Sequence, residues 1–188
     1  YGNYYGLVAT SDAVAVDNTV FDNLNYGLGM HDSSQVRQNR SYNNAYGLYV
    51  GFYASGEASG NLLYQNRAGG ILVESAGSPG VGLRNNTVVQ VGAGQTLRVQ
   101  GGARNLFVQN NILWAGAGVT ALSVAPDSQF NFNSDYNLFW TPDGGLLGQW
   151  ENRDFTNRVD WFYEVGLDQH SRVADPLFVD PDGPDNLS

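Results

Sequence analysis

Four residues of the types that serve in acid–base catalysis and charge stabilisation stand at matching places in successive segments of the chain. His31, Tyr49, Glu74 and Arg98 each lie in or just after a short stretch that alternates apolar residues with others. An arginine can neutralise the carboxylate of a bound sugar acid. A histidine or a tyrosine can then take the neighbouring proton while the other serves the leaving oxygen. The set predicts uronate elimination or epimerisation, with these four residues in catalytic roles.

The residues are positioned by a repeat that fills the first two-thirds of the chain. Each copy has a short Gly-apolar-x-apolar half, such as Gly70 to Val73, and an Asn-x-x-aromatic-x-Asn half, such as Asn61 to Asn66. Alternation of this kind is typical of a short strand with one buried face. The six strand halves are Gly6–Ala9, Gly27–Met30, Gly47–Val50, Gly70–Val73, Thr96–Val99 and Ala121–Val124.

The spacing of the copies predicts a solenoid. The first asparagines of the copies are 21, 22, 25, 25 and 26 residues apart: Asn18, Asn39, Asn61, Asn86, Asn111 and Asn137. This spacing leaves no room for a helical crossover, and Asn-Gly or Asp-Gly hairpin signals are missing from the copies. Each copy is therefore expected to make one full turn, with parallel pairing to the next turn and the asparagines stacked in a hydrogen-bonded ladder.

These copies resemble the repeat of right-handed parallel β-helix proteins, the superfamily that includes pectate-lyase-like and other polysaccharide-active enzymes. The resemblance covers about residues 1–140. It implies an all-β, right-handed parallel β-helix of about six turns. Because this scaffold hosts lyases, hydrolases, epimerases and non-catalytic surface proteins, it leaves the function open.

In such a solenoid the third and fifth positions of each strand half point outward. The middle turns then carry His31, Tyr49, Glu74 and Arg98 on one outer face. Asp32 and Gln100 lie beside them and are candidate substrate-binding residues. A row of polar groups of this kind suits an extended, hydrogen-bonding ligand such as a polysaccharide. The alternative is a merely solvated polar face.

A hydrolase would need a pair of carboxylates on this face. Asp32 and Glu74 lie two turns apart, which corresponds to about 10 Å along the axis. That separation is at or beyond the upper end for an inverting enzyme and too wide for a retaining one.

A second outward column stands three residues after each stacked asparagine: Phe21, Tyr42, Tyr64, Val89, Trp114 and Trp140. Sugar rings stack on such aromatic stripes, so Tyr64 and Trp114 are further candidates for substrate binding. In the other interpretation, the rings stack on one another or are covered by the C-terminal segment.

The remaining residues, 141–188, are predicted to form an acidic segment that closes the solenoid. Asp154 is a plausible N-cap for a helix over about 155–165, with Phe155, Val159, Phe162 and Val165 on its apolar face and Gly166 just past its end. The run from Gly166 to Asp180 resembles the tail of bacterial secreted β-helix proteins. An open solenoid end exposes strand edges and apolar side chains, so a cover is expected there.

Metal binding has one candidate, near the C-terminus. Asp180 and Asp182 could hold Ca²⁺, although their spacing is not that of an EF-hand loop and the nearby prolines restrict the backbone. Asp-Pro and Asp-Gly are equally ordinary turn formers, so no cofactor is required. His170 is expected to act as a turn residue that caps local backbone.

Charge and composition exclude several classes of partner. Residues 1–126 carry six acidic residues and six arginines, whereas residues 127–188 carry 12 acidic residues and three arginines. Neither part offers a basic face for nucleic acid. Cysteine is absent, which excludes disulfides and thiolate sites, and no apolar run is long enough to span a membrane.

The sequence thus predicts an extracellular or cell-surface protein that engages a polysaccharide or cell-surface glycan, with a uronate lyase or epimerase activity as one form of that function. The chain starts in mid-repeat at Tyr1, so we expect it to be a piece of something longer. The alternative function is a non-catalytic structural or adhesion module that associates end to end through its first turn.

Overall fold

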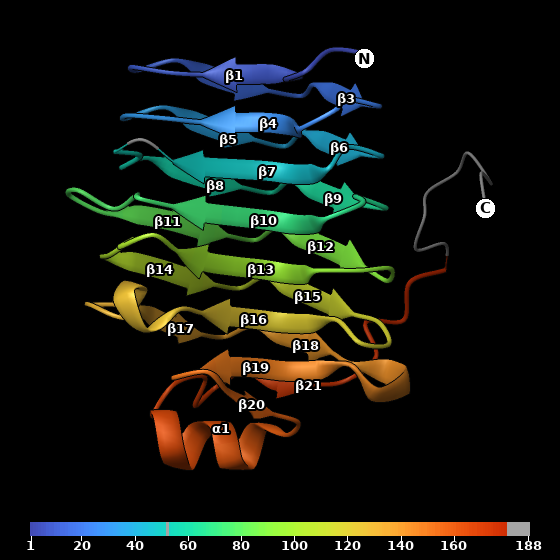
Figure 1. Ribbon diagram of the computed structural model, residues 1–188, viewed down its shortest axis with the longest axis vertical. Helices are drawn as coiled ribbons and strands as arrows, with labels where there is room; N and C mark the ends of the chain where they lie inside the picture. The colour runs from blue at the N-terminus through green and yellow to red at the C-terminus, as the bar shows by residue number, and fades with distance from the viewer. Residues whose placement is uncertain (52, 180–188) are drawn as a thin grey trace.

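The chain folds into a parallel β-solenoid of about six turns (Figure 1). A computed structural model describes residues 1–51 and 53–179. Three sheets run along the axis, and the strand of each turn pairs in parallel with the corresponding strands of the turns before and after it. The predicted fold class is confirmed.

The first sheet carries the strand halves of the repeat. Its strands, in spatial order, are β1 (Leu7–Ala9), β4 (Tyr26–Met30), β7 (Tyr46–Gly51), β10 (Gly69–Glu74), β13 (Gln95–Gln100), β16 (Thr120–Val124), β19 (Leu146–Trp150) and β20 (Arg153–Phe155). The predicted inward positions fill the interior. Leu48, Val50 and Val73 are fully buried, and Ile71 is 2% exposed.

Two further sheets of short strands, which the sequence pattern did not reveal, are formed by the segment before each stacked asparagine and by the asparagine half that follows it. The second sheet holds β2 (Val14–Val16), β5 (Gln35–Arg37), β8 (Glu57–Ser59), β11 (Val81–Arg84), β14 (Leu106–Gln109) and β17 (Asn133–Asp135). The third holds β3 (Thr19–Phe21), β6 (Arg40–Tyr42), β9 (Leu62–Tyr64), β12 (Thr87–Gln90), β15 (Ile112–Ala115), β18 (Leu138–Trp140) and β21 (Arg172–Val173). A strand of three residues places only one or two side chains inside, which is too few to produce a visible alternation.

A ladder of stacked asparagines joins the second sheet to the third. Oδ1 of Asn61 accepts hydrogen bonds from the backbone N and Nδ2 of Asn39, both at 3.0 Å. The amide of Asn61 in turn donates to Oδ1 of Asn86 and to the backbone oxygen of Val36, both at 2.9 Å. The bonding pattern continues from Asn18 to Asn137, so the predicted ladder is confirmed. It satisfies polar groups that have little access to water at the turn.

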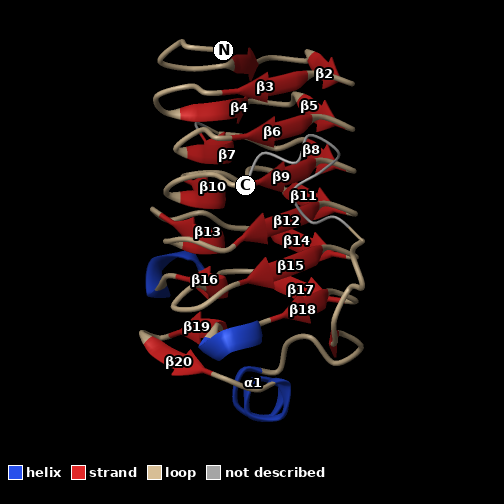
Figure 2. Cartoon of the chain, turned by 90° about the vertical axis from the view of Figure 1, so that its right-hand side faces the viewer, coloured by secondary structure: helices blue, strands red, loops and turns tan. Residues whose placement is uncertain are grey.

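The last turn is closed by β19, β20 and the helix α1 (Arg158–Val165), which lies at the end away from the N-terminus (Figure 2). The helix starts later than predicted. Asp154 lies in β20 and pairs with Gln149, while Asn157 is the N-cap and accepts from the backbone N of Asp160. Gly166 ends the helix at φ 80°, as predicted.

The face of α1 that meets the solenoid also differs from the predicted one. Trp161 is fully buried, whereas Val159 is 56% exposed. The indole of Trp161 contacts Phe155 and Trp150 edge-to-face, with ring centroids 5.3 Å and 6.2 Å apart. A Cβ at Gly148 would lie 2.5 Å from Cζ3 of Trp161, so this glycine of β19 makes room for the tryptophan that plugs the open end of the core.

At the opposite end, β1, β2 and β3 are the terminal strands of their sheets. Several large apolar side chains of the first turns are exposed there, among them Tyr1 and Leu24. End-to-end association through this turn stays a prediction. Among the described residues, no helix has the length and apolar character needed to cross a bilayer.

Candidate functional site

The predicted catalytic residues lie on the outer face of the first sheet. Tyr49, Leu72 and Arg98 are register partners across β7, β10 and β13, and Gly51, Glu74 and Gln100 are partners two residues further along. Neighbouring strands are about 4.8 Å apart, so each row presents one side chain per turn. His31 follows β4 directly, on the next turn toward the N-terminus.

Stacked tyrosines form the N-terminal part of this face. The ring centroids of Tyr5 and Tyr26 are 4.5 Å apart, and those of Tyr26 and Tyr49 are 5.0 Å apart with an interplanar angle of 12°. Two glycines make room for the rings. A Cβ at Gly29 would lie 2.7 Å from Cε2 of Tyr26, and one at Gly51 would lie 2.5 Å from Cζ of Tyr49. The rings of Tyr26 and Tyr49 therefore lie flat along the sheet, and these two residues are about nine-tenths buried, whereas Tyr5 is exposed.

Glu74 links this stack to the polar part of the face. Its Oε2 accepts a hydrogen bond of 3.2 Å from the Tyr49 hydroxyl, and its Oε1 accepts one of 2.8 Å from Nε2 of Gln100. The His31 ring lies 5.7 Å from that of Tyr49, and its Nδ1 is 3.0 Å from the backbone oxygen of Gly51. Three of the predicted catalytic residues and one predicted binding residue thus form a single cluster.

The tyrosine stack and Glu74 border a hollow of about 280 Å³. Its walls are Tyr5, Asn25, Tyr26, Tyr49, Leu72 and Glu74. The apolar floor of tyrosine rings and Leu72, with a carboxylate, an amide and hydroxyl groups at its edge, has the mixed character of a small-ligand site.

The surroundings of Tyr49 keep its hydroxyl protonated. Burial, followed by the charge and hydrogen bond of Glu74, raises the pKa of Tyr49 to about 12. At pH 7 only about one molecule in 10⁵ would carry the phenolate. Tyr49 is thus a hydrogen-bond donor at neutral pH and a poor base.

An alkaline titration provides a test of this environment. A tyrosine whose folded pKa lies above its ordinary value of 10.0 stabilises the fold below pH 10, and that contribution is lost as the pH rises through about 12. In a pH titration followed by the ultraviolet absorbance of tyrosinate, we expect the part of the change that occurs near pH 12 to be smaller in Tyr49→Phe than in the wild type. The control Tyr163→Phe, at a position 80% exposed, should leave that part unchanged. If the absorbance change at the highest pH values were the same in the wild type and in Tyr49→Phe, the raised pKa of Tyr49 would be contradicted.

Two predicted residues of the face stand apart from the cluster. Oδ2 of Asp32 accepts from the Thr10 hydroxyl at 2.7 Å and from the backbone N of Ser11 at 3.1 Å. These bonds lower the pKa of Asp32 and tie its carboxylate to the first turn, on the side away from Glu74. Arg98 is exposed beside Leu72 and reaches the solvent.

The second column of aromatic residues lies on a different face, along the third sheet. Its first rings stack on one another. The ring centroid of Tyr42 is 5.2 Å from that of Phe21 and 5.0 Å from that of Tyr64. Tyr64 is 2% exposed, and Trp114 stacks on Phe178 of the C-terminal segment at 6.0 Å. Mutual stacking and cover by this segment account for the column. The helix α1 contacts β19 and β20 instead.

The predicted calcium ligands Asp180 and Asp182 lie outside the described residues. In turn, sequence reasoning missed Tyr5, Tyr26 and Leu72 as members of the candidate site. A signal for Tyr26 was available, because Tyr26 and Tyr46 occupy the same place in successive copies and Gly29 opens space on the outer face.

The repeat region matches one family of known proteins. Residues 1–140 match the family model described as periplasmic copper-binding protein (NosD). The chain belongs to the NosD family. No curated protein and no solved structure matches it.

Membership of the NosD family covers the turns that build the tyrosine face. It therefore agrees with the β-helix resemblance of the repeats and with the parallel solenoid. The match ends at Trp140, so β19, β20 and α1 lie beyond it.

Proposed function

We propose that this chain is a non-catalytic binding module of the cell envelope that holds a polysaccharide along the outer face of the first sheet. The observation that carries the proposal is the cluster in which Glu74 joins the tyrosine stack to Gln100, at the edge of a hollow. The family is described as periplasmic, which supports a location of this chain outside the cytoplasm. The extracellular or cell-surface location predicted from the sequence is kept as part of the proposal, since it also lies outside the cytoplasm.

A glycan suits this face because hydroxyl-rich ligands need many donors and acceptors beside apolar surface. Arg98 continues the row that starts at Tyr49, and Ser123 and Gln149 follow it on the next strands. The Ser123 hydroxyl donates to Oε1 of Gln149 at 3.1 Å. Polar groups thus recur on every turn from β7 to β19, which favours a ligand that extends along the solenoid axis.

We favour binding over uronate elimination because Tyr49 and Glu74 are already engaged with each other in the cluster, which leaves the His31 imidazole as the candidate base. Tyr49 holds its proton, and the Glu74 carboxylate already accepts two hydrogen bonds. The Asp32 carboxylate is held at the first turn, so a hydrolytic pair with Glu74 is not assembled. Arg98 can still neutralise a uronate carboxylate, which is a binding role.

Copper is the ligand named in the family description, and the donors of this chain do not fit it. Soft copper sites use cysteine and methionine sulfur, and others use several imidazoles. The chain has no cysteine and one methionine, Met30, which is fully buried in the core. Its two histidines lie far apart along the axis, His31 directly after β4 of the first sheet and His170 just before β21, the last strand of the third sheet, so they do not form one site. No group of three or more metal-binding side chains occurs within residues 1–51 and 53–179.

Calorimetry with a panel of uronate and neutral polysaccharides tests the proposal. We expect binding to at least one polymer, and a roughly tenfold to hundredfold loss of affinity in Glu74→Ala, because hydrogen bonds to a charged group are lost. The control Glu164→Ala removes a carboxylate from the exposed side of α1 and should bind like the wild type. Binding that is unchanged in Glu74→Ala, or absent across the panel, would refute the proposal.

Two further measurements separate the alternatives. Ultraviolet absorbance of an unsaturated product during incubation with uronate polymers, lost in Arg98→Ala, would indicate a lyase instead. Filaments in electron microscopy without any glycan would favour the structural module that associates end to end.

A further inference from the structure

A second, larger hollow lies near the capped end of the solenoid, where the second sheet turns into the third. Its volume is about 670 Å³, and it is lined among others by Asn110, Tyr136, Leu138, His170, Arg172 and Asp175. Tyr136 stands between β17 and β18, while His170 and Arg172 come from the segment that runs into β21. Residues 32 or more positions apart therefore meet on one surface that shares no lining residue with the tyrosine face.

The hollow contains a flat platform of two rings. Tyr136 and His170 stack with centroids 4.8 Å apart and an interplanar angle of 8°. Tyr136 is nevertheless 55% exposed, and the His170 side chain is 51% exposed. Each ring can cover only one face of the other, so outer faces and edges remain open to a ligand.

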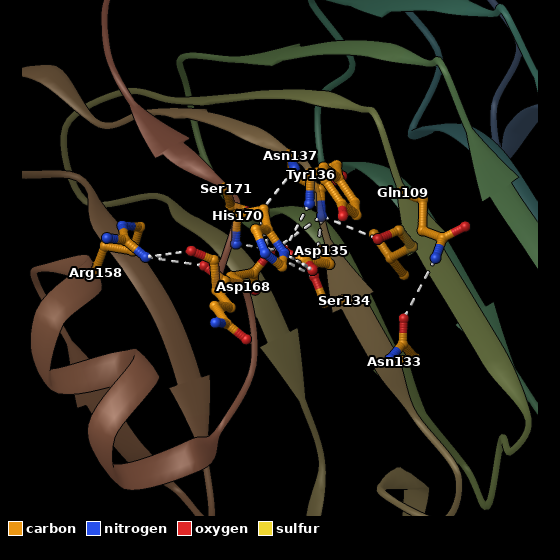
Figure 3. A network of polar contacts seen from close by, with 12 residues as sticks. Gln109, Asn133, Ser134, Asp135, Tyr136, Asn137, Arg158, Asp168, His170 and Ser171 are labelled. Carbon is orange, nitrogen blue, oxygen red and sulfur yellow. Dashed lines mark hydrogen bonds and ion pairs between the residues drawn. The ribbon is translucent and has the colours of Figure 1, made fainter.

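Hydrogen bonds from β17 and from α1 hold the His170 side of the platform in place (Figure 3). The backbone N of His170 donates to Oδ1 of Asp135, and its Nδ1 lies 2.7 Å from Oδ2 of the same carboxylate. Arg158 of α1 donates to the backbone oxygens of Asp168 and Gln169 at 3.0 Å and 3.1 Å, which fixes the loop before His170. An exposed ring pair with this much support loses little conformational entropy when it binds.

The groups around the platform define the class of ligand. Arg172 contributes a guanidinium, which pairs with a carboxylate in a planar, two-pronged geometry. Asn110 offers an amide and Asp175 a carboxylate for hydroxyl groups, and the rings offer an apolar surface. The excess of acidic residues after position 126 disfavours polyanions, but a single carboxylate can be neutralised by Arg172.

We propose that this hollow binds one acidic sugar residue, a hexuronate, which stacks on the Tyr136–His170 platform and directs its carboxylate to Arg172. The inference shares only its ligand class with the proposed function of the tyrosine face. The two sites involve different side chains, so they can be tested separately.

The test is an NMR titration of the full chain with sodium glucuronate, glucose and sodium acetate. We expect glucuronate to shift the backbone signals of Tyr136, His170 and Arg172 at lower concentrations than glucose or acetate does. Tyr136→Ala should weaken glucuronate binding about three- to tenfold, because a stacking surface is lost. Arg172→Gln should abolish the preference for glucuronate over glucose.

Matched controls keep the result specific. Tyr163→Ala removes an exposed tyrosine from α1, and Arg37→Gln removes an exposed arginine from β5; both should leave the titration unchanged. Glu74→Ala should also leave it unchanged, even though it disables the tyrosine face. Equal shifts with acetate and glucuronate, no shifts at the three residues, or full binding by Tyr136→Ala would overturn the proposal.

Discussion

Replacing Asp168 by alanine is expected to lower the free energy of unfolding by about 3 kcal/mol, because several buried donors lose their acceptor at once. Oδ2 of Asp168 accepts from Nε1 of Trp161 at 2.9 Å. Its Oδ1 accepts from the hydroxyls of Ser134 and Ser171 at 2.9 Å and 2.6 Å, and from Nδ2 of Asn137 at 3.2 Å (Figure 3). The carboxylate thus connects the end of the asparagine ladder to the tryptophan that plugs the core.

Chemical denaturation of Asp168→Ala measures this loss. The control is Asp12→Ala at the opposite end, where the carboxylate is exposed and accepts from the Ser33 hydroxyl. An exposed hydrogen bond of this kind should change the stability by no more than about 0.5 kcal/mol. Equal effects of the two substitutions would show that Asp168 does not hold the closing segment.

A double-mutant cycle isolates the contact with Trp161. Asp168→Asn keeps the acceptor Oδ1 but can direct an amide NH₂ at the indole N–H, so two donors meet. In a Trp161→Phe background that conflict disappears, and Asp168→Asn should cost less there by about 1 kcal/mol. Strictly additive effects would contradict the direct hydrogen bond.

The same residue predicts a dependence of stability on pH. Burial raises the pKa of Asp168, against the lowering effect of its hydrogen bonds to Ser171, Asn137, Trp161 and Ser134. Between its ordinary value of 3.8 and the raised value, the folded state binds more protons than the unfolded state. The stability of the wild type relative to Asp168→Asn should therefore be greatest below pH 3.8 and fall as the pH rises through the folded pKa. A rise over that window would contradict the direction of the shift.

The repeats made the architecture predictable, because each inference was supported by several copies. Leu48, Val50 and Val73 had to point inward once the strand halves were aligned, and they are fully buried. Asn61 had to stack on its equivalents because polar turn groups inside a solenoid need partners. Where a copy-to-copy pattern exists, the sequence predicts both the element and its register.

Features that occur once were beyond this kind of reasoning. Asp154 and Asn157 are both acceptable N-caps, and pairing of β20 with β19 decides between them. The burial of Asp168 depends on the end of the ladder and on the Trp161 indole, two groups that only the closed fold brings together. Comparing the repeat copies with one another gives no information about contacts that occur only once in the fold.

The candidate site was predictable in part. His31, Tyr49, Glu74 and Gln100 meet because they hold equivalent outward positions on neighbouring turns. To include Tyr26 in the site, one would have had to know which way its side chain points. Its ring lies over Gly29 rather than above its own backbone, and the repeat pattern alone does not give that direction. The same limit applies to the Tyr136–His170 platform, which joins the last repeat to the closing segment.

Asn61→Ala tests whether the ladder stabilises the solenoid or merely accompanies it. Asn61 is 1% exposed, and its removal leaves the backbone N of Asn39 without its acceptor and the backbone oxygen of Val36 without its donor. Each orphaned buried group costs about 1–3 kcal/mol, so we expect a loss of about 3 kcal/mol. For a chain of this length the corresponding fall in Tm is about 6–12 °C.

Asn18→Ala is the matched control, because Asn18 begins the same ladder. Its amide donates to Oδ1 of Asn39 at 2.9 Å, but no described residue donates to its own Oδ1, and the side chain is half-buried. We expect Asn18→Ala to lower the free energy of unfolding by less than half as much as Asn61→Ala does. If both substitutions cost the same small amount, the stacked strands alone stabilise the turns. If Asn61→Ala costs far more, as we expect, each inner asparagine couples the turn before it to the turn after it, as the hydrogen bonds of Asn61 to Asn39 and Asn86 indicate.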